Sequence, residues 1–247
     1  MSRADRDSPD IGQVHRILKR EFEKHRMPVV DLIETHTHDP FKVLLSTILS
    51  ARTRDRTTTE VCQRLFSRIS GPRDLVGLTL EELRKLIFPV GFYRQKALAL
   101  KKLPHVLDRR FGGRLPETVE ELVELPGVGR KTANLVVAVG FRKPAVCVDV
   151  HVHRICNRLG YVTTRTPYET ETELRKKLPR RYWITINSYL VSFGQHLCTP
   201  RNPRCDRCPI YCHCRRVGVS TLHTRTGEAS KKKGMKHRSK GRPKGKD

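Results

Sequence analysis

Two residues of this chain have types and surroundings that could carry out a covalent reaction. Lys131 follows two glycines in LPGVGRKTAN (residues 125–134), and Asp149 lies between two valines eighteen positions later. A lysine with a lowered pKa can attack a carbonyl carbon and form a Schiff base, although a lysine in such a place more often only contacts phosphate. An aspartate in an apolar run needs a partner or a task. Asp149 could cap a helix, or it could stabilise positive charge or move a proton, and the spacing leaves these alternatives open.

The glycines that precede Lys131 predict a turn that can hold phosphate. The stretch nearly spells a nucleotide-binding P-loop, but Arg130 interrupts the Gly-Lys pair and the preceding ETVEELVEL is helical rather than a strand. A helix–hairpin–helix remains, in which both glycines permit positive φ and backbone amides grip a DNA phosphodiester without reading its sequence. The alternative is an ordinary helix cap joined to another helix. The predicted DNA-contacting residues of this turn are Leu125, Pro126, Gly127, Val128, Gly129 and Arg130.

The cysteines gather near the end of the chain in a pattern that indicates a metal centre. Four of the eight have the spacing C-x6-C-x2-C-x5-C, and these four are Cys198, Cys205, Cys208 and Cys214. Four thiolates can hold a [4Fe–4S] cluster or a zinc ion. Zinc ribbons usually contain two C-x2-C pairs and this chain has one, so the spacing favours the cluster. Cys212 stands too close to Cys214 to be a convenient ligand, and we interpret it as free or packed.

The charge of the chain indicates a polyanionic partner. Lys and Arg number 50 against 25 Asp and Glu, which gives a net charge of +25 and a pI of about 10.3. Double-stranded DNA is the partner that this excess favours, and an anionic membrane surface is a distant second. Apolar runs are too short for a membrane span, and the charged N-terminus does not read as a secretory signal.

The elements that must position these residues are helices. Apolar residues recur at helical spacing through most of the chain, and no strand pair or β–α–β rhythm is visible, so we predict an all-α fold of about ten helices. Asp39 before Pro40 marks a helix start, and Thr79 with Glu82 forms a capping box. AVCVDVHVHR predicts a short extended piece followed by a helix from about Val150.

Three of these motifs together resemble a known family. LPGVGRKTAN, VDVHVHRICNRLG and the four-cysteine spacing, in this order, look like endonuclease III, the iron–sulfur branch of the helix–hairpin–helix DNA glycosylases. GFYRQKA at 91–97 also resembles its family counterpart, and the likeness covers roughly 11–216. It implies two helical domains with a DNA groove between them. One is a central helical barrel, 31–144, and the other combines 11–30 with 145–216 and carries the cluster loop. Residues 1–10 and the basic tail, 217–247, are predicted to be disordered, and the tail to tether DNA.

The resemblance also implies a reaction. Lys131 matches the catalytic lysine of the family and Asp149 its catalytic aspartate. A lysine at this position implies a bifunctional DNA N-glycosylase and AP lyase, which removes oxidised pyrimidines through a Schiff base and β-elimination. The rival interpretations are a monofunctional mismatch-specific glycosylase of the same fold, which removes thymine or adenine without cleaving the strand, and a helix–hairpin–helix protein that binds DNA without catalysis.

The remaining expectations concern DNA contacts and context. The family implies a structural role for the [4Fe–4S] cluster, which would shape a loop whose arginines face phosphates, namely Arg201, Arg204 and Arg207. Arg52 stands where the family usually has glutamine, a residue that enters the space left by the flipped base. Arg52 could fill that space or only contact phosphate. Asp55 is expected to cap a helix. We expect a monomer that is cytoplasmic, associated with the nucleoid, and prokaryotic.

Overall fold

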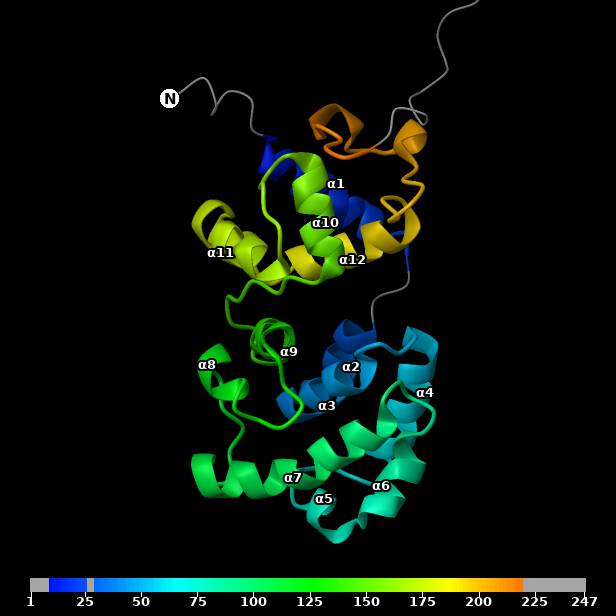
Figure 1. Cartoon of the computed structure of the whole chain (residues 1–247), viewed down its shortest axis with the longest axis vertical. Helices are drawn as coiled ribbons and strands as arrows, with labels where there is room; N and C mark the ends of the chain where they lie inside the picture. Colours follow the sequence, from blue (N-terminus) through cyan, green and yellow to red (C-terminus); the bar gives the residue numbers. More distant parts are fainter. Residues whose placement is uncertain (1–8, 26–28, 220–247) are drawn as a thin grey trace, which may run out of the picture.

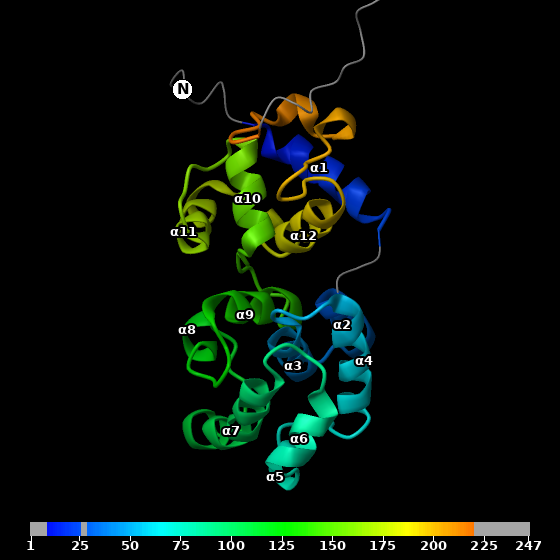
Figure 2. The same ribbon diagram turned by 45° about the vertical axis from the view of Figure 1, so that its right-hand side comes forward.

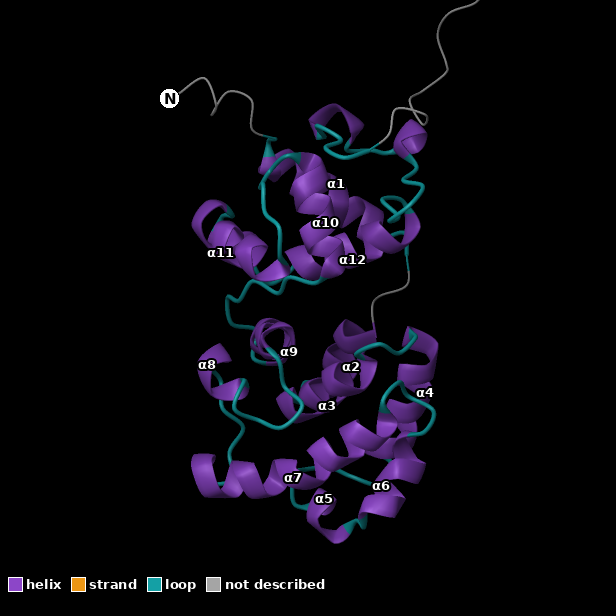
Figure 3. Cartoon of the chain, in the orientation of Figure 1, coloured by secondary structure: helices purple, strands orange, loops and turns teal. Residues whose placement is uncertain are grey.

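The computed structural model describes residues 9–25 and 29–219, and within them it contains helices and loops but no strand (Figure 3). Two groups of helices lie one above the other in both views (Figures 1 and 2). The lower group, here the central domain, contains α2 (Val29–Thr37), α3 (Pro40–Ser50), α4 (Asp55–Phe66), α5 (Asp74–Gly77), α6 (Leu80–Ile87), α7 (Tyr93–Phe111), α8 (Val119–Leu122) and α9 (Arg130–Leu135), which continues into a π-helical turn (Val136–Gly140). The upper group, here the terminal domain, contains α1 (Ile11–Phe22), α10 (Val150–Leu159), α11 (Pro167–Lys177) and α12 (Ile186–His196), with short 3₁₀ turns at Arg180–Tyr182, Cys205–Arg207 and Tyr211–His213. The all-α prediction is therefore confirmed, and the twelve α-helices of the described part exceed the expected ten because α5 and α8 are single turns.

Each domain has its own hydrophobic core. Leucines and valines of α3, α4, α6 and α7 fill the first, and α1, α10 and α12 surround the second. Val29 and Val30, which precede the predicted start of the central domain at residue 31, also pack in the first core. The exact division of the chain otherwise stays a prediction.

The chain crosses from the first core to the second in an extended segment before α10. Ala145 and Cys147 are buried in the central core, whereas Val146 and Val148 are buried in the terminal core. Alternation of side chains between two faces is the period of a strand, which explains the strand-like composition of this segment. The expected helix begins at Val150, as predicted.

The predicted helix starts at Asp39 and Thr79 are confirmed. The Asp39 side chain accepts a hydrogen bond from the Phe41 amide. Thr79 and Glu82 form the reciprocal capping box, which satisfies amides that the first turn of a helix leaves unpaired.

The expected helix cap at Asp55 and part of the predicted disorder are wrong. Asp55 is the first residue of α4 rather than its cap; the cap position is Arg54, which makes no side-chain hydrogen bond there. Asp10, placed in the predicted disordered segment, caps α1 by accepting hydrogen bonds from the amides of Gly12 and Gln13. The predicted disordered tail also begins too early, because residues 217–219 are described and the Val217 amide donates to the Arg158 carbonyl at 3.0 Å. Residues 1–8 and 220–247 lie outside the described residues. In the part of the chain that the structure describes, no helix is long and apolar enough to cross a membrane.

Candidate active site

The hairpin before Lys131 is a tight turn between α8 and α9. Leu125 and Val128 are buried, 2% and 7% exposed, and they fix the hairpin in the central core. Their side chains therefore cannot contact DNA, and any contact by these two predicted residues is through the backbone. Helix α9 makes its first internal hydrogen bond from the Ala133 amide to the Gly129 carbonyl, so the amides before Ala133 are the ones a helix start leaves unpaired.

The two glycines of the hairpin have different reasons to be glycine. Gly127 has φ of +80°, and a Cβ on it would lie 2.9 Å from the Ala99 side chain. Gly129 does not have the expected positive φ: it is extended, with φ of −94° and ψ of 173°. Nothing lies within 4 Å of the position of a Cβ on Gly129. Gly127 thus permits the turn, whereas Gly129 leaves open space at the start of α9.

Lys131 and Asp149 come together although they belong to different domains. The Nζ atom of Lys131 lies 3.8 Å from Oδ2 of Asp149. The other carboxylate oxygen, Oδ1, accepts hydrogen bonds from the amides of His151 and Val152 at 2.8 and 2.9 Å. Asp149 is therefore both the cap of α10 and the partner of the lysine, so the capping role is confirmed and the catalytic role stays a prediction.

The two side chains differ in their access to solvent. The Lys131 side chain is 54% exposed and the Asp149 side chain is 8% exposed. A buried, fixed carboxylate beside an accessible amine can hold positive charge next to a bound substrate. Asp55, whose pKa is raised by partial burial, also lies near enough for the charge of Lys131 to oppose that rise.

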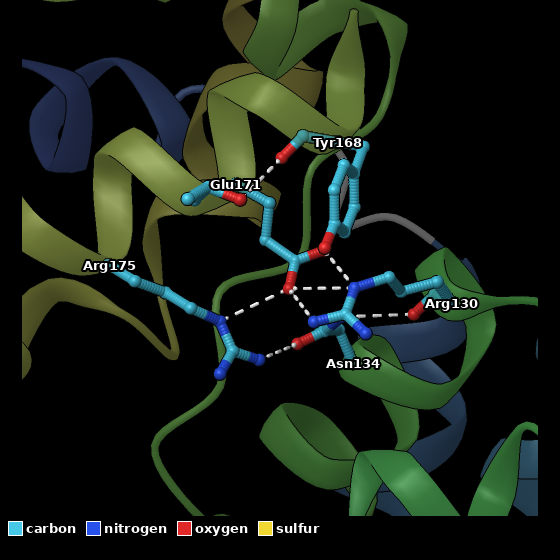
Figure 4. A network of polar contacts seen from close by, with 6 residues as sticks. Arg130, Asn134, Tyr168, Glu171 and Arg175 are labelled. Carbon is cyan, nitrogen blue, oxygen red and sulfur yellow. Dashed lines mark hydrogen bonds and ion pairs between the residues drawn. The ribbon is translucent and has the colours of Figure 1, made fainter.

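Arg130, one of the predicted DNA-contacting residues, turns its side chain away from the hairpin toward the terminal domain. Its guanidinium donates to both oxygens of Glu171 on α11 (Figure 4). The carboxylate holds the pKa of Arg130 above its usual value. Its charge is thus matched by a protein carboxylate, although the side chain is 40% exposed, and its contact with DNA stays a prediction.

Arg52 lies on a loop beside a second exposed side chain that sequence reasoning did not single out. The Arg52 guanidinium stands 5.2 Å from the centre of the Phe92 ring. Both residues have left-handed backbones, with φ of 54° and 58°, and Phe92 is 54% exposed. A Cβ at Gly91 would lie 2.4 Å from the Arg52 carbonyl, so the two loops touch only because residue 91 is glycine.

Lys96 stabilises the Arg52 loop through hydrogen bonds to the backbone. It is 8% exposed, and its ammonium donates to the carbonyls of Leu49 and Ala51 at 2.8 and 2.7 Å. Those carbonyls belong to the end of α3, where a cation is favourable. The sequence indicates that Lys96 is buried, since it lies on the apolar face of α7 between Tyr93 and Leu100.

We expect Lys96→Met to lower the free energy of unfolding by about 1–3 kcal/mol, because buried carbonyls lose their donor. Burial lowers the pKa of Lys96 to about 8, whereas an unfolded lysine titrates near ~10.4. Between these values the unfolded chain binds more protons at this residue, so stability relative to Lys96→Met should rise with pH. Urea unfolding from about pH 7.5 to about pH 10 measures this difference. Lys102→Met, at an exposed position of α7, is the control, and a difference that does not change with pH would contradict the prediction.

The four cysteines of the predicted cluster site line one cavity. Cys198, Cys205, Cys208 and Cys214 surround it, and burial raises the pKa of the Cys208 thiol to about 12. The apolar wall comes from α10, α12 and the loop, through Ile155, Phe193, Leu197 and Ile210. Among the described residues, no group of three or more His, Cys, Asp or Glu is arranged for a single metal ion.

The loop that carries these cysteines lies at the end of the terminal domain away from α9 (Figures 1 and 2). Arg201, Arg204 and Arg207 are all exposed on it. Cys212 is exposed and does not line the cavity. These placements leave the arginines accessible to a DNA strand and separate the cysteine cavity from Lys131.

Comparisons with known proteins agree on one family. Residues 45–180 match the HhH-GPD superfamily of base excision DNA repair proteins. The chain belongs to this superfamily. Endonuclease III of Thermotoga maritima is 50% identical over 191 residues, which cover 76% of this chain and 90% of that protein. Endonuclease III of Bacillus subtilis is 39% identical over 178 residues, 72% of this chain and 81% of that protein. A structure of a trapped endonuclease III–DNA covalent intermediate superimposes with a TM-score of 0.70 at 34% identity, covering 83% of this chain and 95% of that one.

These findings confirm the resemblance to endonuclease III. The chain is a base excision DNA repair enzyme of that family, a DNA glycosylase and AP lyase that binds DNA. The helix–hairpin–helix motif of the HhH-GPD superfamily lies within the matched residues. Membership of an enzyme family also argues against the interpretation as a non-catalytic DNA-binding protein.

Proposed function

We propose that this enzyme removes oxidised pyrimidines from double-stranded DNA with Lys131 as its nucleophile and Asp149 as its catalytic carboxylate. The observation that supports the proposal is the 3.8 Å approach of Lys131 Nζ to Asp149 Oδ2 at the start of α9. Lys131 is accessible to a flipped nucleotide, and the buried carboxylate beside it is held by two backbone amides. Chemistry on a base requires that the nucleotide leave the stack.

The reaction follows from these two side chains. The neutral amine of Lys131 attacks C1′ of the flipped nucleotide, the glycosidic bond breaks, and the base leaves with the proton that the attacking nitrogen gives up. The negative charge of Asp149 stabilises the positive charge that develops on the sugar. Opening of the sugar gives a protonated Schiff base between Nζ and C1′. Loss of a C2′ proton then expels the 3′ phosphate by β-elimination, and water releases the lysine.

We expect Asp149→Asn to slow base release by about 10²-fold because the neutral amide cannot balance the developing charge. Asparagine caps a helix about as well as aspartate, so the free energy of unfolding should change by less than about 1 kcal/mol. Single-turnover kinetics together with thermal unfolding separate the two effects. A large loss of stability with an equal loss of activity would mean that Asp149 matters only as the cap of α10.

We propose that the four-cysteine cavity holds a [4Fe–4S] cluster. The residues present fit the group, because four thiols surround one apolar space and each can bind a different iron of the cluster. Its position away from α9 supports a structural role, in which it holds a loop that presents Arg201, Arg204 and Arg207 to phosphates. The net charge of +25 supports binding of DNA by phosphate contacts.

The context that we propose is a monomer acting on the nucleoid in the cytoplasm of a prokaryotic cell. One panel of substrates tests the proposed reaction, with oxidised pyrimidines, thymine and adenine mismatches, and an AP site, each assayed for base release and for strand cleavage. We expect release of oxidised pyrimidines together with cleavage of the AP site. Base release from mismatches without strand cleavage would instead indicate a monofunctional mismatch glycosylase.

A further inference from the structure

Glu171 joins the two domains beside the candidate active site (Figure 4). Its carboxylate is only 6% exposed and faces two arginines. Arg130 Nη2 donates to Oε1 at 2.9 Å, and Arg130 Nε donates to Oε2 at 3.0 Å. Arg175 Nε lies 3.1 Å from Oε1. One buried carboxylate of α11 therefore makes a bidentate salt bridge with Arg130, the first residue of α9. The planar guanidinium is suited to this geometry.

Further hydrogen bonds extend this contact along both helices. Arg175 Nη2 donates to Oδ1 of Asn134 at 3.2 Å. The Asn134 side chain in turn donates to the Arg130 carbonyl at 3.0 Å. Each helix thus contributes two residues one turn apart, and the Tyr168 ring lies 5.2 Å from the Arg130 guanidinium. Charged groups in such a network resist being separated, because removing one leaves another buried and unpaired.

The network lies next to the proposed nucleophile in the chain. Lys131 directly follows Arg130 in the first turn of α9. Asp149 caps α10, which packs against α11 in the terminal domain. The side-chain network between α9 and α11 therefore helps to bring Lys131 and Asp149 together. The extended segment that links the domains also contributes to this relation, since the buried Cys147 thiol donates to the Lys131 carbonyl at 3.6 Å.

We propose that Glu171 is a positioning residue, which holds α9 against α11 through Arg130 and so keeps Lys131 within reach of Asp149. The role rests on the proposed function of Lys131. It also gives the side chain of Arg130, which is 40% exposed, a purpose other than binding phosphate. Glu171 acts through the lysine and does not touch the substrate.

The test compares Glu171→Gln with Glu173→Gln. Both changes remove one negative charge from α11, but Glu173 makes only a surface ion pair with Lys176 of the same helix. Each protein, as the full chain, is measured for thermal unfolding, for the Kd of an AP-site duplex, and for the single-turnover rate of strand cleavage with enzyme in excess. We expect both variants to bind DNA at least as tightly as the wild type, since each is more positive.

The rates should separate the two variants. We expect Glu171→Gln to cleave about 10–100-fold more slowly than Glu173→Gln, because a displaced nucleophile loses most of its advantage. Equal rates overturn the proposal, and so does an equally large loss of DNA binding, which would mark a general structural defect. If Glu171→Gln does not fold, Arg130→Lys takes its place, since it keeps the charge but loses the two-pronged contact. A wild-type rate for Arg130→Lys would overturn the proposal.

Trapping of the covalent adduct tests the proposed function separately from the proposed role of Glu171. Trapping of a covalent adduct by Lys131→Ala would show that the nucleophile is wrong. Equal cleavage by Glu171→Gln and Glu173→Gln would show that the network does not position it. The two results are independent of each other.

Discussion

Lys131→Ala protein should form no covalent adduct when it is mixed with AP-site DNA and sodium borohydride. Borohydride reduces the Schiff base between an amine and C1′, so the adduct requires the Nζ atom that this substitution removes. We expect strand cleavage at the AP site to fall by about 10³-fold or more, because the loss of a nucleophile cannot be replaced by positioning alone. The wild type should give one adduct, visible as a shifted band on a denaturing gel.

The control for this experiment is Lys143→Ala, which removes the same positive charge at another position. Lys143 lies on the surface of the same domain, where it pairs with Glu117. Lys143→Ala should weaken DNA binding slightly and leave the adduct intact. Removal of Lys131 should also spare the Kd, since the side chain contributes one charge among many on a chain of net charge +25. An adduct of normal yield from Lys131→Ala would show that Lys131 is not the nucleophile.

The fold was predictable because its signals are local. Helical spacing of apolar residues and caps such as Thr79 act within one or two turns, so they can be read without knowing the tertiary contacts. The same holds for Gly127, whose turn needs a positive φ that the local sequence indicates. The positive φ expected of Gly129 was wrong, because its backbone is extended and open space surrounds the position of a Cβ.

The candidate site was only partly predictable because its residues meet across domains. Lys131 and Asp149 could be named, but the single ion pair that joins them depends on how α9 and α10 sit relative to each other. The ion pair of Arg130 with Glu171 was not predicted, because Glu171 lies 41 residues further along the chain. No periodicity within one helix reveals such a pairing.

The Arg52 loop illustrates a third kind of difficulty. Its left-handed backbone, its contact with Phe92 and its support by Lys96 depend on two loops that approach closely at Gly91. Such contacts follow from tertiary packing, which sequence spacing does not give. The motif GFYRQKA contained three of these residues, yet only the structure explains why a glycine, an aromatic residue and a lysine are needed there.

Cys208→Ser should abolish the visible colour of the purified protein, whereas Cys212→Ser should keep it. Cys208 lines the cavity shared by the four cysteines, and Cys212 is exposed and outside it. A [4Fe–4S] cluster absorbs visible light and carries about four irons, so iron content should fall from about four per chain to a small fraction in the first variant. A zinc site would instead give a colourless wild type with about one zinc.

Loss of the cluster should weaken DNA binding without preventing formation of the Schiff base. The loop is also held by Arg158, which donates to the carbonyls of Thr199 and Pro200, so part of its path should survive without the cluster. Cys208→Ser should therefore bind DNA about tenfold more weakly, as the loop arginines lose their fixed positions. Its adduct with borohydride should persist at high DNA concentration, because Lys131 lies away from the loop. Loss of the adduct at saturating DNA, with α-helical content unchanged by circular dichroism, would contradict a purely structural cluster.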